Sequence, residues 1–191
     1  MKFTTTLACA AALLTSAAFA DGHGTWTSTE AAVAFGSIKK DTVGEIHHFT
    51  NVKGEVTEDG QLTITIDLAS AETNIDIRNE RMQEHVFAGM PNAVFSGSVD
   101  MSEVENLAVG ETTLAYVEGD LSLGPVDAFV DTDMLVARLA EDKVLVTTSD
   151  FIIVSTADLG IDAGVDKLME LANLPGITRV TPVSIRMILE K

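Results

Sequence analysis

Histidine is the residue type in this chain best suited to metal chemistry, and its spacing limits what it can do. The 191 residues include four histidines and one cysteine. His47 and His48 are adjacent, so in an extended strand their side chains would point to opposite faces and could not share one metal ion. We expect one packed and one solvated imidazole there. His85 has no histidine or cysteine four residues away, so these three residues predict no metal centre.

The fourth histidine, His23, would become the third residue of the mature protein if the chain were cleaved after Ala20. Asp21, Gly22 and His23 would then offer a planar site of four nitrogens: the free amine, two deprotonable backbone amides and the imidazole of His23. Such a site suits Cu(II) or Ni(II). The alternative is a frayed terminus without a ligand. Three residues often match such a pattern by chance, so we favour the frayed terminus and predict no metal.

Carboxylates are abundant but do not indicate an acid–base site. The chain has 29 Asp and Glu against 12 Lys and Arg, a formal net charge of −17. With so many acids, some pair will always have the spacing of a general acid and general base by chance. Nucleophile-elbow, zinc-protease and phosphate-loop motifs are absent from the sequence. An acidic surface also opposes nucleic-acid binding, which needs basic patches. We therefore predict neither an enzyme nor a nucleic-acid-binding protein, and no cofactor.

Residues 1–20 have the pattern of a signal peptide. Lys2 gives a positive start, an apolar run extends from Leu7 to Ala18, and the small-x-small cleavage motif ends at Ala20. The run is too short to cross a bilayer, which takes about 20 residues. We expect residues 1–20 to be removed, Cys9 among them. Residues 21–191 would then form one periplasmic or secreted domain without stable membrane insertion.

The elements that must position any site are mostly strands. Apolar residues alternate strictly from Gln61 to Leu68, as in a half-buried strand. The turn residues before this strand predict that it forms a hairpin with Lys53–Thr57. The predicted turn is a two-residue turn in which Asp59 and Gly60 both have positive φ. Short strands separated by turns predict an antiparallel sandwich or barrel. Seven further runs have strand character: Thr25–Phe35, Val43–Phe49, Ala93–Asp100, Thr112–Leu123, Ala128–Ala140, Lys143–Val154 and Thr178–Leu189.

Two segments have helical rather than strand character. Ile75–Phe87 combines good helix formers with spaced apolar residues, and Asn74 is placed to cap it. Gly164–Asn173 has apolar residues at helical spacing. Arg78 and Arg81 would lie on one face of the first helix. Two acids flank these arginines. The pair could therefore belong to an exposed helix surface with local ion pairs, or equally to a binding site.

Several motifs in the central part of the chain resemble those of the YceI-like family of exported polyisoprenoid-binding proteins. The resemblance rests on four segments in order, namely residues 70–74, 78–82, 86–87 and 91–95. Val33–Phe35 and Gly54 upstream, and Gly119–Leu123 downstream, are similar to further family motifs. The chain departs from the family pattern in four places: Asn79, Val86, Gly124-Pro125 and Lys39-Lys40.

The resemblance implies a lipocalin-like antiparallel β-barrel whose long apolar interior holds an isoprenoid chain of the quinone or polyprenyl type. The chain would then be mainly β, with two short helices. Arg78 is the candidate for the lipid head. The candidates for the lining share an apolar, bulky side chain: Phe35, Phe49, Met82, Phe87, Phe95, Tyr116 and Phe129. Each of these could equally belong to an ordinary packed core, because ligand pockets and cores share the same composition.

Two other functions remain open at this point. A carboxylate-dependent hydrolase or isomerase in the same barrel would need a buried acid with a raised pKa. A secreted interaction module would have a fully packed core, without a cavity of about 300 Å³ or more. For a carrier, the acidic chain predicts that a neutral quinone or alcohol head binds more tightly than a diphosphate. The length of the lipid and the oligomeric state do not follow from the sequence.

Overall fold

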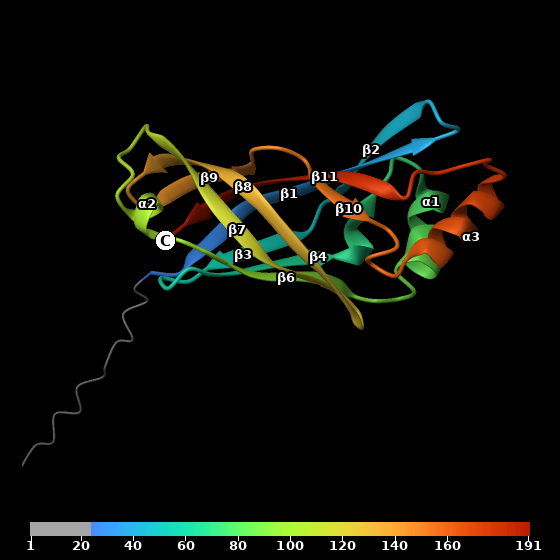
Figure 1. Ribbon diagram of the computed structural model, residues 1–191, viewed down its shortest axis with the longest axis horizontal. Coiled ribbons are helices and arrows are strands. Elements are labelled where there is room, and N and C mark those ends of the chain that lie inside the picture. Colours follow the sequence, from blue (N-terminus) through green and yellow to red (C-terminus); the bar gives the residue numbers. More distant parts are fainter. Residues whose placement is uncertain (1–23) are drawn as a thin grey trace, which may run out of the picture.

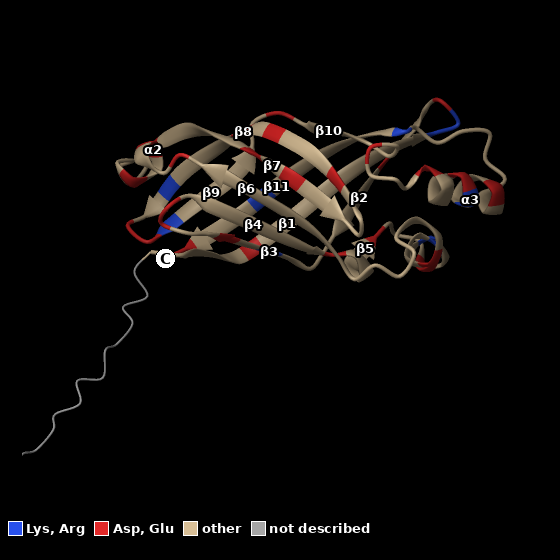
Figure 2. Ribbon diagram, turned by 60° about the horizontal axis from the view of Figure 1, so that its bottom comes forward, with Lys and Arg blue, Asp and Glu red and all other residues tan. Residues whose placement is uncertain are grey.

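A computed structural model of the chain describes residues 24–191 (Figure 1). The predicted signal peptide, Cys9 and the possible Asp21-Gly22-His23 site lie outside these residues. Within them, no helix is long and apolar enough to cross a membrane. Acidic residues are spread along the strands and loops (Figure 2).

Eight antiparallel strands form a closed barrel in the order β1-β3-β4-β6-β7-β8-β9-β11, and β11 pairs with β1 to complete the circle. Closure confirms the predicted mainly β barrel and rejects the two-sheet sandwich. A barrel of this size has just enough interior to hold side chains or one small ligand. The barrel strands have these bounds: β1 Trp26–Lys39, β3 Val52–Val56, β4 Gln61–Asp67, β6 Asn92–Val99, β7 Thr112–Leu123, β8 Val126–Ala140, β9 Lys143–Thr148 and β11 Val180–Glu190.

Three short strands extend the wall beyond one end of the barrel. β2 (Val43–Phe49) pairs with the second half of β1, and β5 (Ala71–Glu72) adds to β2. On the other side, β10 (Ile152–Ser155) pairs with the first half of β11. The single strand predicted over Lys143–Val154 is therefore two strands, β9 and β10, which pair with different halves of β11.

Both predicted helices are present, with shifted ends. The first is α1 (Asp76–Arg81), which continues as a π-helical turn over Met82–Val86. The second is α3 (Asp162–Ala172). Two short helical segments that the sequence did not predict complete the set: α2 (Ser102–Glu105) and a 3₁₀ turn over Leu68–Ser70.

The predicted cap on α1 is wrong. Ile75, not Asn74, precedes the helix, and its side chain makes no capping hydrogen bond. Asn74 instead takes a left-handed conformation with φ 62°. A residue of the helix itself fixes the segment before it, because the side chain of Asn79 in α1 accepts a hydrogen bond, through Oδ1, from the Thr73 backbone N–H at 2.9 Å.

The β3–β4 hairpin exists, but its turn differs from the predicted one. Gly60 has φ 79°, whereas Asp59 does not have positive φ. The Gly60 N–H donates to the Thr57 carbonyl at 3.0 Å, so the loop has three residues rather than two. A Cβ at Gly60 would lie 2.1 Å from the Val99 carbonyl oxygen, so only glycine fits this position.

Candidate functional site

The barrel encloses a cavity of about 540 Å³ whose walls are almost wholly apolar. All eight barrel strands contribute lining side chains, and residues of α1 and α3 complete the lining at one end. Pockets that bind drug-sized ligands have volumes of about 300–1,000 Å³. The interior is therefore not a fully packed core.

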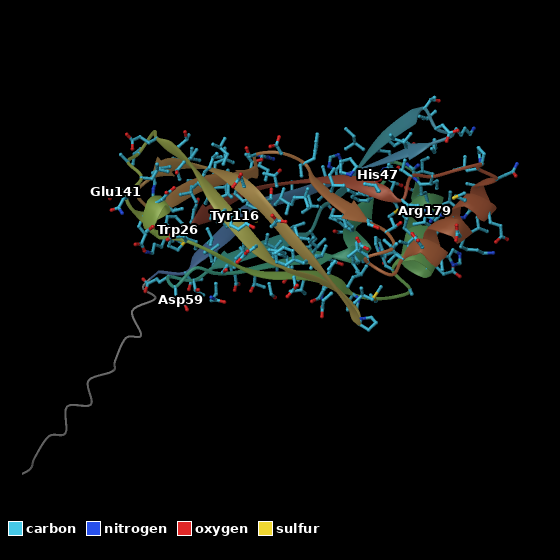
Figure 3. All side chains as sticks on the ribbon, viewed as in Figure 1. Trp26, His47, Asp59, Tyr116, Glu141 and Arg179 are labelled. Carbon is cyan, nitrogen blue, oxygen red and sulfur yellow. The ribbon has the colours of Figure 1, made fainter. Side chains whose placement is uncertain are left out.

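One end of the cavity is sealed. Trp26 is buried there, and the guanidinium of buried Arg138 lies 5.2 Å from the centre of its indole ring. Arg138 also donates to two backbone carbonyls, that of Val104 in α2 and that of Glu141. Figure 3 shows Trp26 and Glu141 together at this end, which we call the closed end.

The opposite end is open. Ile75 and Ile77 line the cavity but are about half exposed to solvent. The β1–β2 hairpin and the loop after α3 also line this end, and Figure 3 shows His47 and Arg179 there. We call it the mouth, because it is where lining side chains reach solvent.

The inward-facing pairs along β1 and β2 become more polar towards the mouth. Val33 pairs with Phe49 deepest in the barrel, and Phe35 pairs with His47 one step further out. Ser37 with Glu45 follows. Along these two strands, an amphiphile with its tail in the barrel would therefore meet polar side chains only at its outer end.

Two cations share the Glu45 carboxylate at the mouth. Lys39 Nζ lies 2.9 Å from Glu45 Oε1, and Arg78 Nη1 lies 2.9 Å from Glu45 Oε2. The other terminal nitrogen of Arg78 donates to the Thr73 carbonyl. Burial alone would raise the pKa of the Glu45 carboxyl, but Lys39 and Arg78 outweigh it, so the pKa lies below its ordinary value. Arg78 thus pairs across to β2, not with the acids of its own helix as the sequence suggested.

His47 is the buried polar group between the apolar wall and this ion cluster. Its side chain is buried, whereas His48 is exposed, which confirms one packed and one solvated imidazole. His47 Nε2 lies 3.1 Å from Ser37 Oγ, and Nδ1 is buried without a hydrogen-bond partner. Burial, and then the charge of Arg78, lower the pKa of His47. His47 therefore lines the cavity as a buried imidazole whose surroundings favour the neutral form.

Five of the seven apolar residues predicted for the lining do line the cavity: Phe35, Phe49, Met82, Phe87 and Phe95. Phe35 stacks on Phe49 with ring centres 5.0 Å apart, and Phe49 lies 5.9 Å from Phe87. Arg78 also lines the mouth, as predicted. Whether these side chains contact a ligand stays a prediction.

Tyr116 and Phe129 do not line the cavity, so their predicted placement is wrong. They are 52% and 65% exposed, and the Tyr116 hydroxyl donates to Asp131 on the outer wall at 3.2 Å. Strand alternation explains this, because the neighbours Val117 and Val130 point inward.

The mouth also holds four polar residues that were not predicted as site residues from the sequence, namely Ser37, Lys39, Glu45 and His47. A signal was present in the chain. Ser37 and Lys39 follow Phe35 at intervals of two, and His47 and Glu45 precede Phe49 in the same way. In a strand such residues share a face. Within residues 24–191, no three or more His, Cys, Asp or Glu side chains are grouped to hold a metal ion.

A closed antiparallel barrel around a mainly apolar cavity, with a cluster of charged and polar side chains at its open end, is the architecture of a protein that binds a lipophilic ligand. The comparisons with known proteins agree with this class. Residues 24–173 match the model of the YceI-like domain. The chain belongs to the YceI-like domain family.

Solved structures give the same picture. A polyisoprenoid binding domain from Saccharophagus degradans, described as implicated in plant cell wall breakdown, is 33% identical with a TM-score of 0.83 and covers 87% of this chain and 98% of its own. BcnA from Burkholderia cenocepacia has 15% identity and a TM-score of 0.63, covering 83% of this chain and 95% of its own, and shows a similar fold. A search of curated proteins found no match.

Proposed function

We propose that the protein is a carrier or sequestering protein that holds the hydrocarbon tail of an isoprenoid lipid inside the barrel. The observation behind the proposal is the apolar cavity of about 540 Å³ with a single polar mouth. Each CH₂ group removed from water contributes about 0.8 kcal/mol, so a prenyl tail supplies ample driving force. The polyisoprenoid binding domain at 33% identity supports this class of ligand.

The polar mouth supports a neutral head of the quinone or alcohol type. Both terminal nitrogens of Arg78 are already used by Glu45 and the Thr73 carbonyl, and Lys39 is paired with the same carboxylate. A diphosphate would have to displace Glu45 to gain a two-pronged arginine contact. A carbonyl or hydroxyl head needs only a single hydrogen bond, and Ser37 and His47 supply hydrogen-bonding side chains in the lining of the mouth.

Binding is better supported than catalysis. Glu45 is the only acid among the described residues that line the cavity, and its pKa is lowered. A general acid in an apolar site needs a raised pKa. The cavity also argues against a secreted interaction module with a packed core.

Export belongs to the same proposal. Residues 1–20 have the pattern of a signal peptide, and the mature protein would act in the periplasm or outside the cell. The intact mass of the protein recovered from that compartment is expected to correspond to a chain that begins at Asp21. A mass that retains Met1 would contradict export.

Native mass spectrometry of the protein purified from its source, followed by organic extraction, tests the ligand. We expect a prenyl lipid to co-purify and to be lost after extraction. The stripped protein is then titrated with a prenylquinone. Failure both to retain a lipid and to bind the added prenylquinone would overturn the proposed function.

A further inference from the structure

Three segments far apart in sequence surround the mouth: residues 38–46 at the β1–β2 hairpin, 75–81 around α1, and 171–178 after α3. We call them the rim. The Lys40 N–H donates to the Gly176 carbonyl at 3.1 Å, and the Ile38 N–H donates to Thr178 Oγ1 at 3.0 Å. The Arg78–Glu45 ion pair joins α1 to the hairpin. The rim is therefore one continuous surface, and its hairpin projects beyond the barrel in Figure 1.

The rim is rich in exposed aliphatic side chains, because its 24 residues hold six of the fifteen large apolar residues exposed within residues 24–191. Their exposure ranges from 37% for Leu171 to 67% for Ile46. Clustered exposed apolar side chains mark a site of interaction with a membrane, a ligand or a protein. The residues concerned are Ile38, Val43, Ile46, Ile75, Ile77 and Leu171.

The rim is also the electrically neutral end of an acidic molecule. Its formal charges cancel, with Lys39, Lys40, Arg78 and Arg81 balanced by Asp41, Glu45, Asp76 and Glu80. All of the net negative charge of residues 24–191 therefore lies on the rest of the molecule. An anionic lipid surface repels that acidic body, so the neutral rim is the end that can approach a bilayer at least cost.

We propose that the rim docks the mouth onto a lipid bilayer, with its aliphatic side chains in the interfacial region and the cavity facing the membrane. This inference rests on the proposed function, because an isoprenoid lipid resides in bilayers and has to pass through the mouth. The residence of such a lipid in bilayers and the zero net charge of the rim favour a bilayer over a protein partner.

Co-sedimentation with vesicles of phosphatidylcholine tests the docking. The rim variant combines Val43→Asp and Ile46→Asp, since neither residue lines the cavity. The matched controls are Leu114→Asp on β7 and Ile153→Asp on β10, which are 51% and 64% exposed outside the rim. We expect the rim variant to lose at least about tenfold in vesicle affinity, and the controls to bind like the wild type. Thermal melts of all variants show whether the fold is kept.

Two results would overturn the docking. One is a wild type that does not sediment with vesicles, and the other is a control that loses as much affinity as the rim variant. Size-exclusion chromatography of the wild type and the rim variant tests whether the rim instead binds a second copy of the chain. A wild-type dimer that the rim variant no longer forms would also overturn the proposal.

Prenylquinone binding from detergent solution separates this inference from the proposed function. We expect the rim variant to bind the free lipid like the wild type while extracting it from vesicles at least about tenfold more slowly. If the wild type binds the free lipid but not vesicles, the docking is rejected and the proposed function stands. Absence of lipid binding in the wild type rejects the proposed function itself.

Discussion

The two ends of the barrel each hold an arginine that faces inward, and they hold it in different ways. At the closed end, Arg138 is bound by two backbone carbonyls and the Trp26 ring, and it makes no ion pair with a described carboxylate. At the mouth, Arg78 pairs with Glu45, which it shares with Lys39. Backbone and indole contacts fix a buried cation and seal the end. A shared carboxylate near solvent leaves polar groups that can rearrange around a ligand.

This contrast assigns stability to the closed end and binding to the mouth. Substitutions at the closed end should mainly reduce the free energy of unfolding. Substitutions at the mouth should mainly change which lipid binds and how binding or stability depends on pH.

The largest effect is expected for Trp26→Ala at the closed end. Trp26 is 4% exposed, and truncating a buried tryptophan to alanine costs about 3–5 kcal/mol. Urea denaturation measures the change, with Ile46→Ala at the rim as the control, which should stay within about 0.5 kcal/mol. A cost below about 1 kcal/mol for Trp26→Ala would show that the closed end does not anchor the fold.

A direct comparison of the two arginines comes next. Arg138→Met removes two hydrogen bonds from a buried guanidinium to the Val104 and Glu141 carbonyls, and we expect a loss of about 1–3 kcal/mol. Arg78→Met leaves Glu45 paired with Lys39 and removes one hydrogen bond to a backbone carbonyl, that of Thr73, so the loss should be smaller, about 1 kcal/mol. Both values come from the same denaturation experiment. Equal losses, or a larger loss for Arg78→Met, would reverse the comparison.

The choice of lipid head sharpens the description of the mouth. A prenylquinone should bind more tightly than a prenyl diphosphate of equal length, by at least about tenfold at low salt, and the gap should narrow at high salt as repulsion is screened. Competition between the two lipids in detergent measures the ratio. Tighter diphosphate binding at low salt that disappears in Arg78→Ala would instead make Arg78 a ligand of an anionic head.

The smallest effect concerns His47. Burial and Arg78 lower its pKa in the folded protein, so the unfolded chain takes up this proton more readily. The stability that His47 contributes is present above the unfolded pKa of about 6.5, and it is lost as the pH falls from there towards the folded pKa. The difference in unfolding free energy between wild type and His47→Gln should therefore shrink over that interval. A difference that is independent of pH would contradict a buried neutral imidazole.

Alternation and helix-forming composition made much of the fold predictable. The strict alternation of residues 61–68 predicts β4, and the helix formers of Ile75–Phe87 predict α1. The outer wall was harder, because residues 114–117 and 128–130 are apolar at every position. Alternation cannot assign inside and outside in such a run, and for that reason Tyr116 and Phe129 were placed on the wrong face.

The ion pair at the mouth could not be predicted, for a different reason. It joins Glu45 to Arg78, which are 33 residues apart in the chain. Nothing in the spacing of a single sequence reveals such a pairing. The β2 extension that carries Glu45 and His47 depends on β1 running four residues beyond its predicted end, to Lys39.

The affinity of a prenylquinone for a cavity-filling variant tests the central claim most directly. Ala115 is buried on β7 and lines the cavity, so Ala115→Phe fills space that the tail needs, while Phe129→Ala changes only the outer wall. With folding of both variants verified by circular dichroism, we expect Ala115→Phe to weaken binding at least about tenfold and Phe129→Ala to leave it unchanged. Equal affinity of the wild type and Ala115→Phe would show that the lipid does not enter the barrel.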